Sequence, residues 1–151
     1  MAEALAQRLD RAISRLKTRA MLPVLLLAVA WTQELVDQLF FGGGWNLPLV
    51  HGGPAWGLIT APFSHAGFAH LISNTLWFLP LSWLVVLKGR RDYLAVWLAV
   101  LALEVPVWLF WPSASHGLSG VVYGLLGYLL LIGWLETVSY THLRAHETDS
   151  Y

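Results

Sequence analysis

Apolar residues in this chain are gathered into four long runs, and most polar residues lie in the segments between them. Each run has about 20 residues, which is the length an α-helix needs to cross the hydrocarbon core of a bilayer. Only helices and closed barrels satisfy their backbone hydrogen bonds in lipid, so the pattern predicts an all-α, polytopic membrane bundle. The predicted spans are Met21–Phe41, Phe68–Leu87, Tyr93–Trp111 and Leu118–Leu135.

Composition strengthens this prediction and excludes some classes of function. Of the 151 residues 57% are hydrophobic, and the mean hydropathy is +0.59; a soluble domain has about 45–50% apolar residues. The chain has no cysteine, which excludes disulfide and thiol chemistry. Its formal net charge is zero, which argues against a nucleic-acid partner. The partner that composition predicts is the lipid bilayer.

Residues 1–20 are charged and have no apolar core, so no cleavable signal peptide is expected. Two rows recur at helical spacing within them, one apolar and one basic. We considered a solvated basic helix and an amphipathic helix on the anionic cytoplasmic leaflet, and we favour the second because a span follows directly. The two rows are Leu5, Leu9, Ile13 and Leu16, and Arg8, Arg11, Arg15 and Arg19.

The basic residues also predict the topology. Apart from the last segment, every Lys and Arg precedes the first span or lies in Leu87–Asp92, between spans two and three. The positive-inside rule then puts the amino terminus in the cytoplasm and residues 42–67 outside. That loop is rich in Gly, Pro and Trp, and we expect an interfacial or re-entrant segment anchored by Trp45 and Trp56. We expect Glu34 and Asp37, near the end of span one, to face the bundle or the outer interface.

Two predicted spans begin with polar residues at helical spacing. His70 and Asn74 share a helix face on span two, and Ser119 and Tyr123 share one on span four. Helix–helix hydrogen bonding and small-residue packing would explain them structurally. A serine nucleophile with oxyanion donors would explain them chemically, because a serine in the first helical turn also offers its own free N–H. A stripe of glycines, which permits close helix packing, borders Ser119: Gly120, Gly124 and Gly127.

The segments HAGFAHLISN (65–74) and GLSGVVYGLLGY (117–128) together resemble the rhomboid family of intramembrane serine proteases. The resemblance implies a helical bundle with Ser119 as nucleophile and with His70 and Asn74 as oxyanion stabilisers. It gives supporting roles to Gly117, to His65 near the oxyanion side, and to Tyr123 as the ring that packs on the catalytic histidine. It also implies single-span membrane proteins as substrates, cleaved near the outer face, in a multi-pass protein of a bacterial inner membrane. No metal or organic cofactor is implied.

The resemblance also implies a catalytic histidine on a later, sixth span, and here the chain departs from the family. His51 and His116 do not occupy that position, and His142 and His146 follow the far end of span four. The last residues, Val138–Tyr151, turn abruptly polar, and VSYTHLRAHET resembles a translated sequencing adapter. We therefore expect residues 21–137 to be the first four spans of a six-span core, followed by a non-native tail.

Without its base such a fragment should be inactive alone, because the serine hydroxyl stays protonated near neutral pH. The principal alternative is a non-catalytic rhomboid-like protein that binds membrane helices. A metal site built from His65, His70 and His116 is a remote third possibility, since no carboxylate pattern accompanies these histidines.

Overall fold

The computed structural model describes the backbone of residues 1–148 and the side chains of Met1 and residues 3–138. It is an all-α bundle, which confirms the predicted fold class, and four of its helices are long and apolar enough to cross a membrane. Residues 149–151 of the expected non-native tail lie outside this description. The elements are α1 (Ala2–Phe40), α2 (Gly57–Thr60), the 3-10 helix η1 (Ala61–Phe63), α3 (Phe68–Lys88), α4 (Arg90–Phe110) and α5 (Ser119–Thr148).

The long helices differ from the predicted spans mainly at their ends. α1 joins the predicted amino-terminal helix and the first span into one 39-residue helix with Pro23 inside it. The helix continues through Pro23, and no glycine interrupts it before Phe40. α3 and α4 are separated only by Gly89, and α5 continues past Val138 to Thr148.

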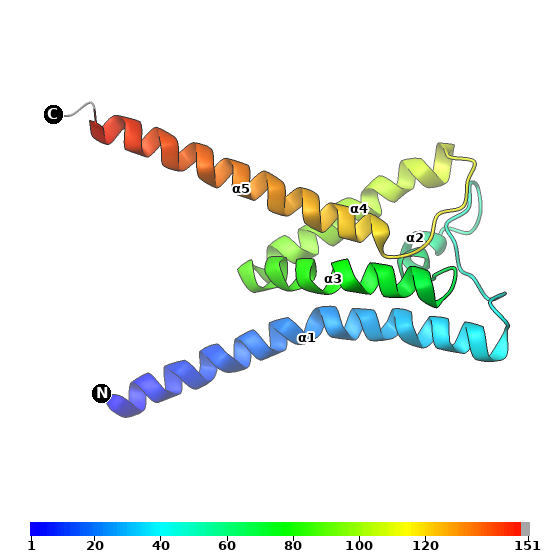
Figure 1. Cartoon of the computed structure of the whole chain (residues 1–151), viewed down its shortest axis with the longest axis horizontal. Helices are drawn as coiled ribbons and strands as arrows, with labels where there is room; N and C mark the ends of the chain where they lie inside the picture. The colour runs from blue at the N-terminus through cyan, green and yellow to red at the C-terminus, as the bar shows by residue number, and fades with distance from the viewer. Residues whose placement is uncertain (149–151) are drawn as a thin grey trace.

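The bundle is built around α3, which contacts α1, α4 and α5. Figure 1 shows these helices side by side at one end, while the amino-terminal part of α1 and the far part of α5 splay apart at the other. Most of the interior is apolar, and within it the hydroxyl of Ser82 accepts a hydrogen bond from the buried Tyr93 hydroxyl at 3.2 Å. The largest apolar side chains of this core include Phe78, Leu71, Leu118, Leu125 and Val85.

Two of the glycines on α5 allow it to approach α4 closely. A Cβ atom on Gly124 would lie 2.5 Å from Val100 Cγ2, and one on Gly120 would lie 3.2 Å from Glu104 Oε1. A Cβ on Gly127 would meet nothing within 4 Å. Gly120 and Gly124 therefore pack against α4, whereas Gly127 has no such neighbour among the described residues.

The connection between α1 and α3, residues 41–67, closes one end of the bundle. Leu49 and Ser115 exchange backbone hydrogen bonds of 2.8 and 2.9 Å. Trp108 Nε1 donates to the Gly53 carbonyl at 2.9 Å, which attaches the loop to α4. These bonds hold the carboxyl ends of α1 and α4 near the amino ends of α3 and α5.

The two carboxylates near the end of α1 are fully buried, as expected of acidic groups in a span. Glu34 accepts a hydrogen bond from the Gln38 side chain, and Asp37 accepts one from the Trp45 backbone N–H. Each carboxylate thus has a donor that lowers the cost of burying its charge.

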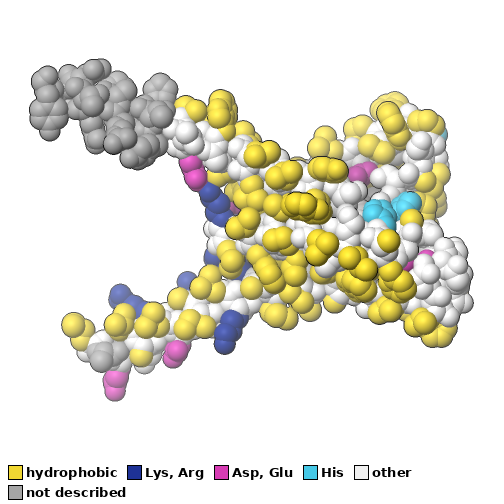
Figure 2. All heavy atoms as spheres, viewed as in Figure 1, with side chains coloured by type: hydrophobic (Ala, Val, Ile, Leu, Met, Phe, Trp, Pro, Cys, Tyr) yellow, Lys and Arg dark blue, Asp and Glu magenta, His cyan; other side chains and the backbone are white. Residues whose placement is uncertain are grey.

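Figure 2 shows the histidines and the basic residues at opposite ends of the bundle. We call the end that carries His65, His70 and His116 the histidine end. The end where α3 meets α4, which carries Lys88 and Arg90, is called the basic end. The orientation of these two ends in the membrane stays a prediction from the loop charges.

Candidate functional site

Ser119 opens α5 at the histidine end, directly after a turn that Gly117 makes possible. Gly117 has a φ of +97°, in the left-handed region that favours glycine. Its N–H donates to the Ala61 carbonyl at 2.8 Å, so the loop between α1 and α3 fixes the turn. The N–H groups of the first turn of α5 have no acceptor within the helix and remain available to a ligand.

The side chains of His70 and Asn74 converge on this turn from α3. A Cβ atom on Gly117 would lie 3.1 Å from His70 Nε2 and 3.3 Å from Asn74 Nδ2. The one-turn spacing on α3 is what lets both nitrogens reach the same place. Within the described side chains, Asn74 Nδ2 is buried and has no hydrogen-bond partner. A donor left in this state usually marks a site that is completed by a ligand or water.

His65 supports the same turn from behind. Its fully buried ring accepts a hydrogen bond from the Leu118 N–H at Nε2, with a donor–acceptor distance of 3.3 Å. Accepting this bond requires the neutral imidazole with its proton on Nδ1. Burial, and next the charge of His70, lower the pKa of His65 to about 4, against a smaller opposing effect of the Phe63 backbone. His65 is thus a neutral structural acceptor at physiological pH.

His116 joins this group, and in the sequence analysis it was placed with His65 and His70 only as a remote metal site. Its ring centroid lies 5.7 Å from that of His70, and His65 lies 5.1 Å from His70 on the other side, both in edge-on arrangements. Burial lowers the pKa of His116, as does His70, while Glu34 raises it. The only local signal was its place three residues before Ser119, and the contact with His70 depends on the fold.

Glu104 was not singled out in the sequence analysis, although a carboxylate inside an apolar run is a recognisable sign of a functional residue. Its Oε1 atom lies 3.2 Å from where a Cβ of Gly120 would be, next to Ser119. Among the described side chains its other oxygen, Oε2, is buried without a hydrogen-bond partner. Glu104 therefore brings a carboxyl group close to the first turn of α5.

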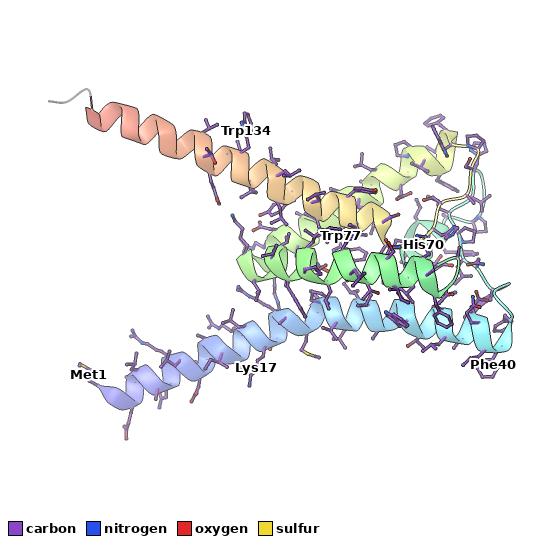
Figure 3. All side chains as sticks on the ribbon, in the orientation of Figure 1. Met1, Lys17, Phe40, His70, Trp77 and Trp134 are labelled. Atoms are coloured by element: carbon purple, nitrogen blue, oxygen red, sulfur yellow. The ribbon has the colours of Figure 1, made fainter. Side chains whose placement is uncertain are left out.

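Ser119 and His70 lie between two hollows. A cleft of about 560 Å³ lies on the side of α4 and the loop before α5, and Trp111, Ser115 and His116 also line it. A groove of about 410 Å³ runs between α3 and α5, past Asn74, Trp77 and Tyr123. Figure 3 labels His70 at the amino end of α3, with Trp77 further along the same helix. The serine is therefore reachable from both sides.

Two residues of the expected site lack the partner that the resemblance implies. In the part of the chain whose side chains are described, Ser119 makes no side-chain hydrogen bond and no ring packs on Tyr123, which is 72% exposed. His142 and His146 lie at least 23 residues further along α5, about 35 Å away at 1.5 Å per residue. Neither can reach Ser119 in this fold.

The proposed three-histidine metal site receives no support from the geometry. Among the described residues, no group of three His, Asp or Glu side chains is arranged to hold a metal ion. His65, His70 and His116 are neighbours, but His65 Nε2 already accepts the Leu118 N–H.

Taken together, the fold and the site define a class: a polytopic helical membrane protein with a serine at a helix start, beside an imidazole and an amide from a second helix. The chain belongs to the rhomboid family, since the family model described as the rhomboid domain matches residues 52–146.

Relatives support the family without specifying an activity. An uncharacterised protein of Mycobacterium leprae is 30% identical over 124 residues, which cover 71% of this chain and 47% of that protein. Uncharacterised proteins of Mycobacterium bovis and Mycobacterium tuberculosis are each 33% identical over 122 residues, covering 70% of this chain and 48% of theirs. The chain thus spans about half the length of these curated relatives. No solved structure matches it.

Proposed function

We propose that this chain carries the nucleophile and the oxyanion-binding half of a rhomboid-type serine endopeptidase. The observation that supports this most is the convergence of His70 Nε2 and Asn74 Nδ2 beside Ser119, with the amide donor buried and unpaired. A purely structural asparagine in a span would be expected to donate hydrogen bonds to a neighbouring helix. An unpaired donor beside a serine is instead suited to the negative oxygen that forms when a hydroxyl attacks a carbonyl.

In the proposed reaction Ser119 Oγ attacks the substrate carbonyl carbon, and the carbonyl oxygen becomes an oxyanion. His70, Asn74 and the free N–H of Ser119 stabilise that oxygen, and the tetrahedral intermediate then expels the amine to leave an acyl-enzyme. Water hydrolyses the ester and restores the serine. A general base must take the hydroxyl proton and return it to the leaving amine, and no described side chain is hydrogen-bonded to the Ser119 hydroxyl in that role.

The proposed substrates are single-span membrane proteins cut near the outer face of a bacterial inner membrane. The histidine end faces outward under the charge rule, and Ser119 is the first residue of α5, directly after the loop. A peptide carbonyl inside a helix is hydrogen-bonded and shielded, so the substrate has to unwind before attack. The clefts on both sides of Ser119 leave room for such an extended segment.

A fluorophosphonate probe tests this proposal, because it labels an activated serine and places an oxygen where the oxyanion would lie. We expect slow labelling of the purified chain at neutral pH, because no described side chain is hydrogen-bonded to the Ser119 hydroxyl as a base. Labelling should be faster as pH rises, since hydroxide can then take the proton. Ser119→Ala should abolish labelling, and Asn74→Ala should slow it at least about tenfold. Ser73→Ala, which also borders the groove, is the matched control and should label normally.

Rapid labelling at neutral pH would contradict the inference that no described side chain acts as the base. Labelling that survives Ser119→Ala would contradict the assignment of the nucleophile. The alternative, a non-catalytic protein that binds membrane helices, is favoured by the exposed Tyr123 and the apolar groove beside it. It predicts no Ser119-dependent labelling at any pH.

A further inference from the structure

The basic end of the bundle holds a second feature that the proposed peptidase chemistry does not use. A hollow of about 350 Å³ lies between α1 and the start of α4. Three guanidinium groups and two hydroxyl groups line it, and they come from helices far apart in the sequence: Ser14, Arg15, Thr18, Arg19 and Arg90. Figure 2 shows basic side chains along this part of α1 and at the adjoining end of the bundle.

The hollow lies at the level where the apolar spans begin. Arg19 comes two residues before the apolar run that starts at Met21, and Arg90 is the first residue of α4. Trp83 Nε1 donates to the Ala20 carbonyl at 2.9 Å, which attaches α1 to α3 just beside the hollow. The arginines are therefore held at the boundary between hydrocarbon and water.

None of the three guanidinium groups forms an ion pair with a described side chain. Among the described side chains the only ion pair joins Lys88 to Glu136, on the other side of the basic end. Asp92, the nearest acid in the α4 sequence, lies against Gly89: a Cβ there would be 2.7 Å from Asp92 Oδ2. Three like charges around one hollow repel one another unless an anion joins them.

The same part of α1 exposes a row of apolar side chains on its adjoining face. They stand out from the bundle with no protein covering them: Leu5, Leu9, Ile13 and Leu16. An apolar row beside a basic row is the pattern of a helix that lies in the membrane interface. The apolar row needs acyl chains, and the arginines need an anion at the same surface.

We propose that the hollow formed by Arg15, Arg19 and Arg90 binds the phosphate of an anionic phospholipid headgroup and thereby couples α1 to α4. Arginine suits this role because its planar fork donates two parallel hydrogen bonds to phosphate oxygens. The hydroxyl of Ser14 can donate to a remaining oxygen, whereas that of Thr18 already donates to the Ser14 backbone carbonyl at 2.9 Å. A basic pocket between spans on the cytoplasmic side is a setting in which anionic headgroups bind.

Native mass spectrometry of the whole chain tests this, with phosphatidylglycerol and phosphatidylcholine of identical acyl chains as the two probes. The wild-type chain should bind phosphatidylglycerol more tightly. Arg90→Gln should weaken that binding about fivefold, the effect of one basic residue near a membrane surface, and leave phosphatidylcholine unaffected. Arg91→Gln removes the same charge one residue away, outside the hollow, and should change binding less than about twofold.

Arg19→Gln and Lys17→Gln form a second matched pair on α1, with the loss expected only for Arg19→Gln. Equal losses in both members of either pair would show diffuse surface attraction and overturn the proposal. So would equal affinity of the wild-type chain for the two lipids. Excess inorganic phosphate should not displace phosphatidylglycerol, because the lipid also covers the apolar row. Displacement would assign the hollow to a free anion instead and overturn the lipid assignment.

Discussion

Replacing Gly117 by alanine tests the site at the point where its parts meet. The new Cβ would lie 2.9 Å from His70 Cε1 and 3.3 Å from Asn74 Nδ2, so at least one of these side chains has to move. The positive φ adds a backbone cost of about 1–2 kcal/mol for any L-residue. Displacing an oxyanion donor lowers the rate of a serine hydrolase by a factor of about 10²–10³.

Gly67→Ala is the matched control for this substitution. Gly67 has a similar φ of +106°, but a Cβ there would meet nothing within 4 Å. Both variants should lower the thermal midpoint in detergent through the same backbone strain. Only Gly117→Ala should slow fluorophosphonate labelling at alkaline pH, by about a hundredfold. Equal labelling rates in the two variants would refute the convergence of His70 and Asn74 on the turn before Ser119.

Three other substitutions separate stability from function. Asn74→Leu removes a buried donor that has no partner among the described side chains, so it should leave stability unchanged or raise it by about 1 kcal/mol. The same substitution should slow fluorophosphonate labelling at least about tenfold. A large loss of stability would show that the amide is structural. The folded-state pKa of His65 is about 4, below its usual 6.5. Its contribution to stability, at most about 3 kcal/mol, is therefore present above pH 6.5 and lost as pH falls toward 4. His65→Gln should flatten this part of a thermal-midpoint-against-pH profile, and an unchanged slope would exclude His65 as its source. Gly124→Ala should destabilise the protein by about 1–3 kcal/mol because its Cβ meets Val100, whereas Gly127→Ala should not destabilise it. Adding Val100→Ala to Gly124→Ala should restore the lost stability. Equal thermal midpoints for Gly124→Ala and Gly127→Ala would contradict the close packing of α5 on α4.

Much of the fold follows from the sequence because the bilayer imposes strong constraints. Runs of about 20 apolar residues have few alternatives to spanning helices, and their number and order were predicted correctly. The shared face of His70 and Asn74 follows from helical periodicity alone. The ends of α1 and α5 were less predictable. Both helices extend beyond the apolar span into polar sequence that also forms helix, so no local signal marks where the helix ends.

The tertiary details of the site could not be read from one sequence. That Gly117 is held by the Ala61 carbonyl depends on how the loop between α1 and α3 folds over the bundle. The clustering of His116 with His70 depends on the same loop. The packing of Gly124 on Val100 required knowing which helix borders α5. Each of these contacts joins segments whose pairing is set by packing and not by spacing along the chain.

The central claim is that Asn74 and His70 point at the atom where negative charge develops on a group bound to Ser119. Solid-state NMR can test it on the phosphonate adduct formed at alkaline pH, by measuring the distance from phosphorus to the asparagine side-chain nitrogen. Asn46→Gln leaves Asn74 as the only labelled asparagine in the chain. We predict a separation of about 4 Å, which corresponds to a hydrogen bond from Nδ2 to a phosphonyl oxygen. No measurable dipolar coupling between the two nuclei would contradict the account.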